Sequence, residues 1–161
     1  MLLLILCSVV FSAWTNHLDL IEVALKDNGL KFTRLDGSMA LSKRTAALAT
    51  FRDDDTIPII LVSIYAGGLG LNLTTANKVY VMEPQFNPAA EAQAVDRVHR
   101  LGQKREVEVV RYIMNYSVEE RVLNIQKKKR DLADLSMNRN LKLDKEQDRK
   151  RKLEELRDLF R

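Results

Sequence analysis

The sequence of 161 residues contains one cysteine, Cys7, so it can form no internal disulfide and cannot supply the ligands of a cysteine-based zinc site. It has no G-x-x-x-x-G-K-[ST] loop for nucleotide phosphates, no Asp-Glu-x-His segment after an apolar strand, and no G-x-G-x-x-G dinucleotide fingerprint. These absences argue against a disulfide-rich secreted domain, a self-sufficient P-loop ATPase and a Rossmann-type enzyme.

A long hydrophobic run is also missing, because the apolar stretch 1–14 is too short to span a bilayer and has no charged residue before it. A secretory signal is the alternative for this stretch. Its β-branched and aromatic residues favour a buried parallel strand over Ser8–Ala13, after a lead-in at Met1–Leu6. We therefore expect no membrane partner.

The composition, with 46% hydrophobic and 30% charged residues, predicts one sizeable core with an appendage. The net charge of +4 is distributed unevenly. Residues 126–161 contain 13 Lys/Arg and 8 Asp/Glu, whereas residues 1–125 contain 13 and 14. An anionic partner such as nucleic acid would therefore interact most strongly with the end of the chain.

Apolar runs alternate with helical patterns along the first two thirds of the chain. Strands are predicted at 8–13, 31–36, 57–63, 78–83 and 106–114, with helices at about 15–28 and 42–53. Thr15 or Asn16 is expected to cap the first helix, and the second is expected to start at Ser38 or Ser42 and to bury an apolar side that includes Ala46, Leu48 and Phe51. The alternation predicts an α/β fold, with a parallel sheet covered by helices on both faces.

The segment from Asn87 to Gln103 has the pattern of one helix, with Asn87 as N-cap, Pro88 at the first helical position and Gly102 as the stop. In such a helix Gln93, Arg97 and Arg100 would lie within roughly 60° of one another. A separate face would hold the apolar residues Ala94, Val98 and Leu101.

Two guanidinium groups a turn apart suit a polyphosphate, because they can neutralise charge on a transferring phosphoryl group. The alternative is a solvated helix face, on which arginines contribute little to stability. Upstream, Gly67, Gly68 and Gly70 follow the predicted strand 57–63. Such a loop can present backbone amides to a phosphate, or can simply mark a tight crossing. The run Asp53–Asp55 lacks the spacing of metal ligands and indicates a solvated helix end, so we expect no metal site.

A last helical region begins at Ser117, with Glu120 three positions later as in a capping box. Its apolar stripe is predicted at Val118, Val122, Ile125 and Leu132. The adjoining basic run could bind phosphates or form a solvated face; it comprises Lys127, Lys128, Lys129 and Arg130. A final amphipathic segment follows from Asp144, after a joint at Asn138–Asn140.

Four segments carry a resemblance to a known family. They read VVFSAW at 9–14, RLDGSM at 34–39, SIYAGGLGLNLTTANKVYVMEPQFNP at 63–88 and QAVDRVHRLGQ at 93–103. In this order they resemble the motifs of the second RecA-like lobe of SWI/SNF-type DNA-dependent ATPases, in helicase superfamily two. The C-terminal segments SVEERVLNIQKKKRDL at 117–132 and RKLEELRDLF at 151–160 resemble those of the RING-finger repair translocases, the group that includes helicase-like transcription factor.

The resemblance implies roles for individual residues. Arg97 and Arg100 would be catalytic arginine fingers, and Gln93 would couple hydrolysis to movement. The nucleotide would also be approached by Gly68, Gly70 and Asn72, whereas DNA would contact Ser12, Trp14, Arg44, Gly67, Leu71 and the basic run 127–130. The expected domains are the lobe at 8–116 and a basic helical bracing extension at 117–161.

The family implies a nuclear enzyme that translocates on double-stranded DNA with ATP and Mg²⁺, with chromatin or repair proteins as further partners. The phosphate-binding lysine and the Mg²⁺ carboxylate belong to a first lobe that this sequence does not contain, so we expect the 161 residues alone to hold no cofactor and to be inactive. The alternative from another class is an ATPase-dead module that binds DNA or protein.

Overall fold

The computed structural model describes residues 7–66, 70–138 and 157, and for 130–138 it describes the backbone alone. These residues form two compact units, one of Met1–Glu83 with Ala89–Tyr112 and one of Pro84–Pro88 with Ile113–Arg161. The predicted domain boundaries, 8–116 and 117–161, remain a prediction. The final segment expected from Asp144 lies outside the described residues, apart from Arg157.

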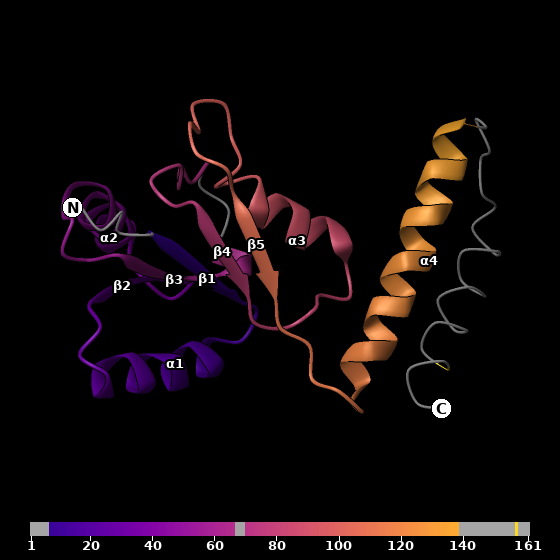
Figure 1. Cartoon of the computed structure of the whole chain (residues 1–161), viewed down its shortest axis with the longest axis horizontal. Helices are drawn as coiled ribbons and strands as arrows, with labels where there is room; N and C mark the ends of the chain where they lie inside the picture. The colour runs from indigo at the N-terminus through magenta and orange to yellow at the C-terminus, as the bar shows by residue number, and fades with distance from the viewer. Residues whose placement is uncertain (1–6, 67–69, 139–156, 158–161) are drawn as a thin grey trace. The chain divides into compact units, whose positions relative to one another are not determined.

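The first unit is built on a five-stranded parallel sheet with the order β2-β3-β1-β4-β5 (Figure 1). The strands lie within the predicted ranges but are shorter, and β5 has fewer than half of the residues predicted for it: β1 Ser8–Ser12, β2 Phe32–Leu35, β3 Ile59–Ser63, β4 Lys78–Val81 and β5 Glu108–Arg111. In the centre of the sheet Ser12 is in register with Ser63, so the segments after β1 and β3 leave the same edge side by side. Ligands of parallel sheets bind at this carboxyl edge.

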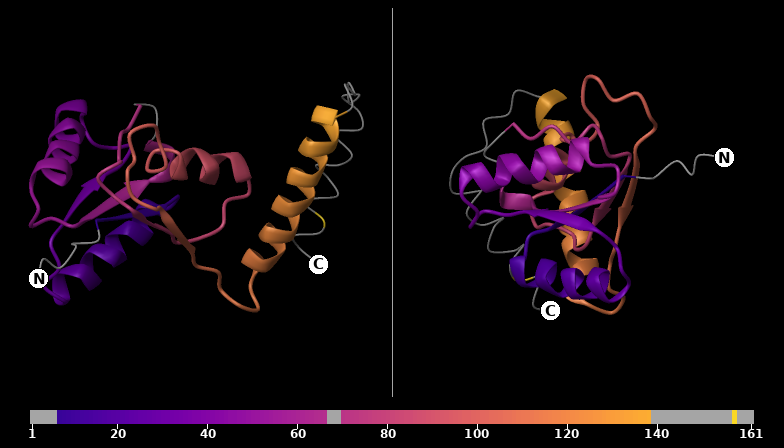
Figure 2. Two further views of the ribbon diagram at one scale, coloured as in Figure 1. Left: turned by 45° about the horizontal axis from the view of Figure 1, so that its top comes forward. Right: turned by 90° about the vertical axis from the view of Figure 1, so that its left-hand side faces the viewer.

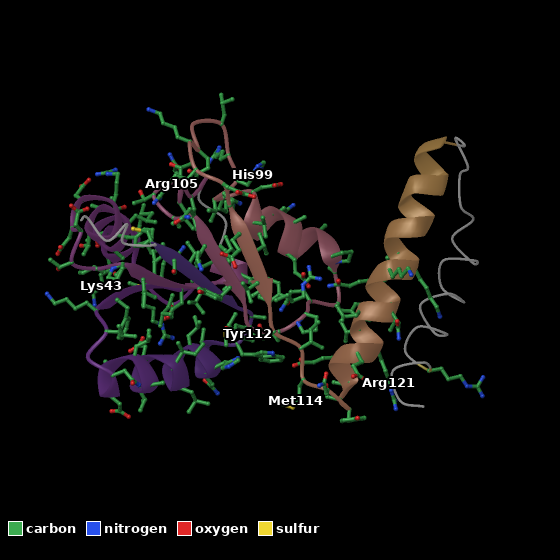
Figure 3. The ribbon with its side chains drawn as sticks, viewed as in Figure 1. Lys43, His99, Arg105, Tyr112, Met114 and Arg121 are labelled. Atoms are coloured by element: carbon green, nitrogen blue, oxygen red, sulfur yellow. The ribbon has the colours of Figure 1, made fainter. Side chains whose placement is uncertain are left out.

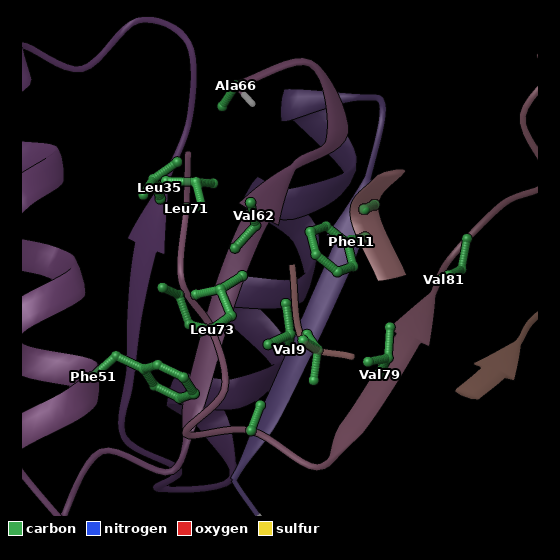
Figure 4. Close-up of a cluster of buried hydrophobic side chains, with 14 residues drawn as sticks. Val9, Phe11, Leu35, Phe51, Val62, Ala66, Leu71, Leu73, Val79 and Val81 are labelled. Atoms are coloured by element: carbon green, nitrogen blue, oxygen red, sulfur yellow. The ribbon is translucent and has the colours of Figure 1, made fainter. Parts of the chain in front are cut away.

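Helices cover both faces of the sheet, as predicted. Helix α1 (Thr15–Asp27) lies on one face, and α2 (Leu41–Asp53) lies on the other (Figure 2, right). On the α2 face, alternate strand residues such as Val9, Phe11 and Val62 form the core with Phe51 of α2 and with residues of α3 (Pro88–Val95). Phe51 extends from α2 toward Leu73 and the strands (Figure 4).

The predicted caps and apolar faces of the first two helices need correction. Trp14 and Ala40 are the N-caps, one residue before the first helical residue in each case, and neither makes a side-chain cap bond. In α2 the buried alanine is Ala47 and not Ala46, because Ala47 lies one turn before the buried Phe51.

The predicted single helix over 87–102 is wrong, because α3 ends at Val95. The next residues turn more tightly, with the Val98 N–H donating to the Val95 carbonyl. The Arg97 carbonyl accepts the Leu73 N–H at 2.9 Å, so a tertiary bond takes the acceptor that a continuing helix would use. Leu101 is consequently fully exposed, whereas Ala94 and Val98 are buried as expected.

The second unit contains α4 (Val118–Asn138), which begins directly after Ser117, the predicted cap. The capping bonds are displaced by one residue: Ser117 Oγ accepts the Glu119 N–H at 3.1 Å, and Glu120 accepts the Tyr116 N–H at 3.3 Å. Of the predicted stripe, Ile125 is buried, Val122 is half-buried and Val118 is exposed, since Val118 stands in the first turn. The Leu132 side chain lies outside the description. No helix among the described residues is long and apolar enough to cross a bilayer.

Three carboxylates surround Arg34 on the edge strand β2. Its Nε donates to Asp36 at 2.8 Å, and its Nη1 donates to Glu22 of α1 at 2.8 Å and to Asp19. Burial disfavours the charged form of Asp36, but hydrogen bonds from Ser38 and Arg34 outweigh burial, so the pKa of Asp36 lies below its ordinary value. Charged Asp36 therefore stabilises the fold.

Replacing Asp36 with asparagine should lower the free energy of unfolding at pH 7 by about 1–2 kcal/mol. Because the pKa of Asp36 is lower in the folded than in the unfolded chain, its contribution is present above about pH 4 and is lost as pH falls through the folded pKa. Urea unfolding of wild type, Asp36→Asn and the control Asp27→Asn from pH 7 to pH 2 measures this. A stability difference that persists undiminished at pH 2 would contradict the assignment.

Candidate nucleotide and nucleic-acid site

The structure brings Gln93, Arg97 and Arg100 together, although α3 does not extend far enough to carry all three. With Asp96 they line one hollow of about 200 Å³. Gln93 and Arg100 are exposed and Arg97 is half-buried. The two guanidinium groups and the amide therefore line one space, as the sequence predicted, but turns at 96–100 place the arginines there instead of a continuous helix.

A second pocket, of about 190 Å³, adjoins Gln93 and Arg97 at the carboxyl end of β3. Ser63 and Tyr65 contribute polar atoms to its lining. Its apolar walls come from the core strands, the loop and α3: Phe11, Val62, Ile64, Leu71, Ala90 and Ala94. This volume is smaller than that of a typical ligand pocket, and the pocket shares Gln93 and Arg97 with the first hollow.

Arg100 is attached to the segment that follows the glycine loop. Its Nη1 donates to the Leu71 carbonyl at 3.2 Å, and two residues later the Leu73 N–H donates to the Arg97 carbonyl. The arginine segment and residues 71–73 are thus held together by bonds between distant parts of the sequence. A displacement of either segment must alter these bonds or move the other segment.

Gln103 is a site-supporting residue that sequence reasoning missed. Its Nε2 donates to the carbonyls of Thr74 at 3.1 Å and Ala76 at 2.6 Å, and its Oε1 accepts the Arg105 N–H at 3.0 Å. Arg105 in turn donates to the Thr75 carbonyl. Figure 3 labels Arg105 and His99 beside the loop that leads to β5. No periodic pattern marks an amide that bonds to main-chain carbonyls, so the sequence carried no signal for it.

The glycine-loop candidates are only partly described. Gly67 and Gly68 lie outside the described residues, whereas Gly70 is exposed with open space where a Cβ would stand. Asn72 is exposed, and its Oδ1 accepts the Thr74 N–H at 3.2 Å. The Leu71 side chain is buried in the core, which leaves its backbone as the part that faces Arg100.

The remaining DNA candidates of the first unit differ in exposure. Trp14 is 68% exposed at the start of α1, whereas Ser12 beneath it is fully buried. Arg44 donates to the carbonyls of Met39 and Gly37, at 2.8 Å each, and so holds the turn after β2. Of these residues, Trp14 presents the largest surface to a ligand.

In the second unit, α4 is fastened to the bend 84–88 that leads into α3. Gln126 is fully buried and donates from Nε2 to the Gln85 carbonyl. The Lys129 Nζ lies 3.6 Å from the centre of the Phe86 ring. Lys127 and Lys128 are exposed, and the Arg130 side chain lies outside the description. The predicted basic run therefore divides into two exposed lysines and one that packs on an aromatic ring.

Among the described residues no three His, Cys, Asp or Glu side chains gather as metal ligands. The hollow lined by Gln93, Arg97 and Arg100 suits an anion.

Comparisons with known proteins agree with these observations. Residues 6–102 match the helicase conserved C-terminal domain. The chain is 52% identical over 128 residues to helicase-like transcription factor of Homo sapiens, covering 78% of this chain and 13% of that protein. It is 44% identical over 154 residues to DNA repair protein RAD5B of Arabidopsis thaliana, covering 96% and 12%. The chain thus spans about an eighth of the length of these relatives.

A solved structure supports the same assignment at the level of the fold. The C-terminal part of the Fun30 ATPase domain matches with a TM-score of 0.72 and 39% identity, over 74% of this chain and 38% of that one. The RecA-like α/β fold expected from the sequence is thereby confirmed, as is the resemblance to a SWI/SNF-type C-terminal lobe.

Proposed function

Because the chain belongs to the helicase conserved C-terminal domain family, we propose that it is the second lobe of a SWI/SNF-type, ATP-dependent translocase on double-stranded DNA. The observation that carries this proposal is the gathering of Gln93, Arg97 and Arg100 around one hollow. The name DNA repair protein RAD5B supports a process in DNA repair. We assign the chain to the nucleus, with chromatin remodelling as the other process.

Arg97 and Arg100 act as arginine fingers in this proposal. Charge spreads over the phosphoryl oxygens as the γ-phosphate of ATP is transferred to water, and two fixed guanidinium groups stabilise that charge. The bond from Arg100 to the Leu71 carbonyl supports a fixed position for one of them. Gln93 shares the hollow and is assigned to coupling hydrolysis with movement.

The other half of the reaction belongs to a first RecA-like lobe. The phosphate-binding lysine and the carboxylate that holds Mg²⁺ are features of the motifs that this sequence lacks. ATP and Mg²⁺ would therefore be held between the two lobes, with Gly68, Gly70 and Asn72 on the side of this chain. Without that lobe the arginines face no positioned phosphate, and the 161 residues alone should not hydrolyse ATP at a useful rate.

DNA contacts are assigned to two regions. On the first unit they comprise Ser12, Trp14, Arg44, Gly67 and Leu71. The side chains of Ser12 and Leu71 are buried, so these two residues would support the DNA-contacting surface by holding the backbone in place. On the second unit the exposed Lys127 and Lys128 carry the charge that binds phosphates. Lys129 serves to hold α4 on Phe86, and Arg130 is assigned to DNA from the sequence alone.

A second candidate function is a module that binds DNA or a protein without hydrolysing ATP. The exposed lysines of α4 favour it, because their charge needs no second lobe.

ATP hydrolysis should appear only when the chain is mixed with a separately expressed first lobe of a related translocase and duplex DNA. Arg97→Ala or Arg100→Ala should then reduce the rate by about 1,000-fold, the scale of an arginine finger. Phosphate release measures the rate. The matched control is Arg52→Ala, which removes an exposed arginine of α2 that is paired with Asp53. Undiminished hydrolysis by both site variants would refute the arginine-finger role, and no hydrolysis by any mixture that still binds DNA would favour the binding module.

Duplex DNA binding by the 161 residues should be weak, indifferent to sequence and sensitive to salt. Replacing Lys127 and Lys128 together by alanine should reduce the slope of log affinity against log salt by about 1.8, because two phosphate contacts are lost. Fluorescence anisotropy of a labelled duplex measures this. Lys31→Ala with Lys43→Ala removes the same charge from the first unit as a control, and an unchanged slope in the α4 variant would assign these lysines to a solvated face.

A further inference from the structure

A buried carboxylate lies at the carboxyl edge of the sheet, beneath the start of α1. Glu83 follows β4 and is 7% exposed. Its carboxylate accepts hydrogen bonds from Ser12 Oγ at 3.1 Å and from the Ala13 N–H, and it lies 3.3 Å from Nδ1 of His17. One side chain thus collects donors from the end of β1, from the connection and from the first turn of α1.

These hydrogen bonds lie on both sides of Trp14 in the sequence. The Trp14 N–H donates to Ser12 Oγ at 3.1 Å, and the Ser12 hydroxyl lies within donating distance of both the Glu83 carboxylate, at 3.1 Å, and the Trp14 carbonyl, at 3.2 Å. Trp14 is the N-cap of α1 and makes no side-chain cap bond of its own. The backbone that carries the exposed indole is therefore fixed by Glu83, from 69 positions further along the chain.

We propose that Glu83 is the positioning residue for Trp14, and that it holds the indole in the orientation in which Trp14 contacts duplex DNA. The second half of this statement rests on the DNA contact assigned to Trp14 above. A charge-assisted bond is stronger than a neutral one, and an indole that is already held in place loses less conformational entropy when it binds.

The geometry of the cluster suits a carboxylate. A carboxylate only accepts, and its two oxygens can serve a hydroxyl, an amide and an imidazole N–H together. The Nδ1–H tautomer of His17 is the one that can donate in this contact. A glutamine at position 83 keeps one oxygen as acceptor but turns an NH₂ group toward one of the three donors. Glu83→Gln should consequently retain only part of the effect.

The test uses Trp14 as its own probe, because it is the only tryptophan of the chain. Time-resolved fluorescence anisotropy of the free protein should show a larger fast component in Glu83→Ala than in wild type, with Glu83→Gln in between. Ser12→Ala breaks the same connection without removing the carboxylate and should act in the same direction. Glu106→Ala, which removes an exposed carboxylate before β5, is the control and should resemble wild type.

Binding to a fluorescently labelled duplex completes the test. Glu83→Ala should weaken binding about fivefold, and no more than Trp14→Ala does, because both variants act through the same indole. Circular dichroism shows which variants are folded. If Glu83→Ala is not folded, the anisotropy decay of Ser12→Ala tests the positioning role instead. Identical anisotropy decays in wild type and in the folded variants would overturn the positioning role. If Trp14→Ala leaves DNA affinity unchanged, the DNA contact of Trp14 fails, which is a different result from unchanged decays.

Discussion

The backbone pairing between residues 71–73 and residues 97–100 is the interaction on which the candidate site depends. The Leu73 N–H donates to the Arg97 carbonyl, and Arg100 donates to the Leu71 carbonyl. The first of these bonds occupies the Arg97 carbonyl, which a helix continuing past Val95 would use, and the chain turns there instead. The turn brings both arginines beside Gln93. Gln103 extends the same attachment to Thr74 and Ala76, so the whole stretch from the glycine loop to β4 is fixed to the arginine segment.

Such an arrangement links the two activities that the proposal assigns to this lobe. Residues 71–73, which follow the glycine loop, are hydrogen-bonded directly to the arginine segment that would meet ATP. A displacement of one segment would therefore alter the position of the other. Elsewhere along the carboxyl edge of the sheet, the buried Glu83 bonds to the residues on either side of Trp14 at the start of α1. In both places hydrogen bonds between residues distant in the sequence hold the backbone beside a side chain that the proposal assigns to ATP or to DNA. In the second unit Gln126 has the comparable task of fastening α4 to the bend before α3.

The sequence predicted the sheet well because its strands are short apolar runs between turn signals, as at Ile59–Ser63, and such runs are fully buried in a parallel sheet. It failed where distant residues decide the local structure. The sequence pattern could not show that the Leu73 N–H would donate to the Arg97 carbonyl. It therefore predicted a helix as far as Gly102, with Leu101 on its apolar face. The same limit hid Glu83 and Gln103, whose partners lie far away along the chain or are main-chain atoms. The arginines themselves were found because their spacing brings them together in a helix and, as it happens, in the turns as well.

The central claim is that Arg97 and Arg100 stabilise the charge of the transferring phosphoryl group. Transition-state analogues report such an interaction directly, because they bind more tightly than ground-state ligands only when the site makes stronger interactions with the transition state. The measurement is the affinity of ADP with and without vanadate for a mixture of this chain, a first lobe and duplex DNA. We expect vanadate to tighten ADP binding at least about 100-fold with the wild-type chain and to have little effect with the Arg97→Ala/Arg100→Ala chain. Equal tightening with both chains would contradict the account.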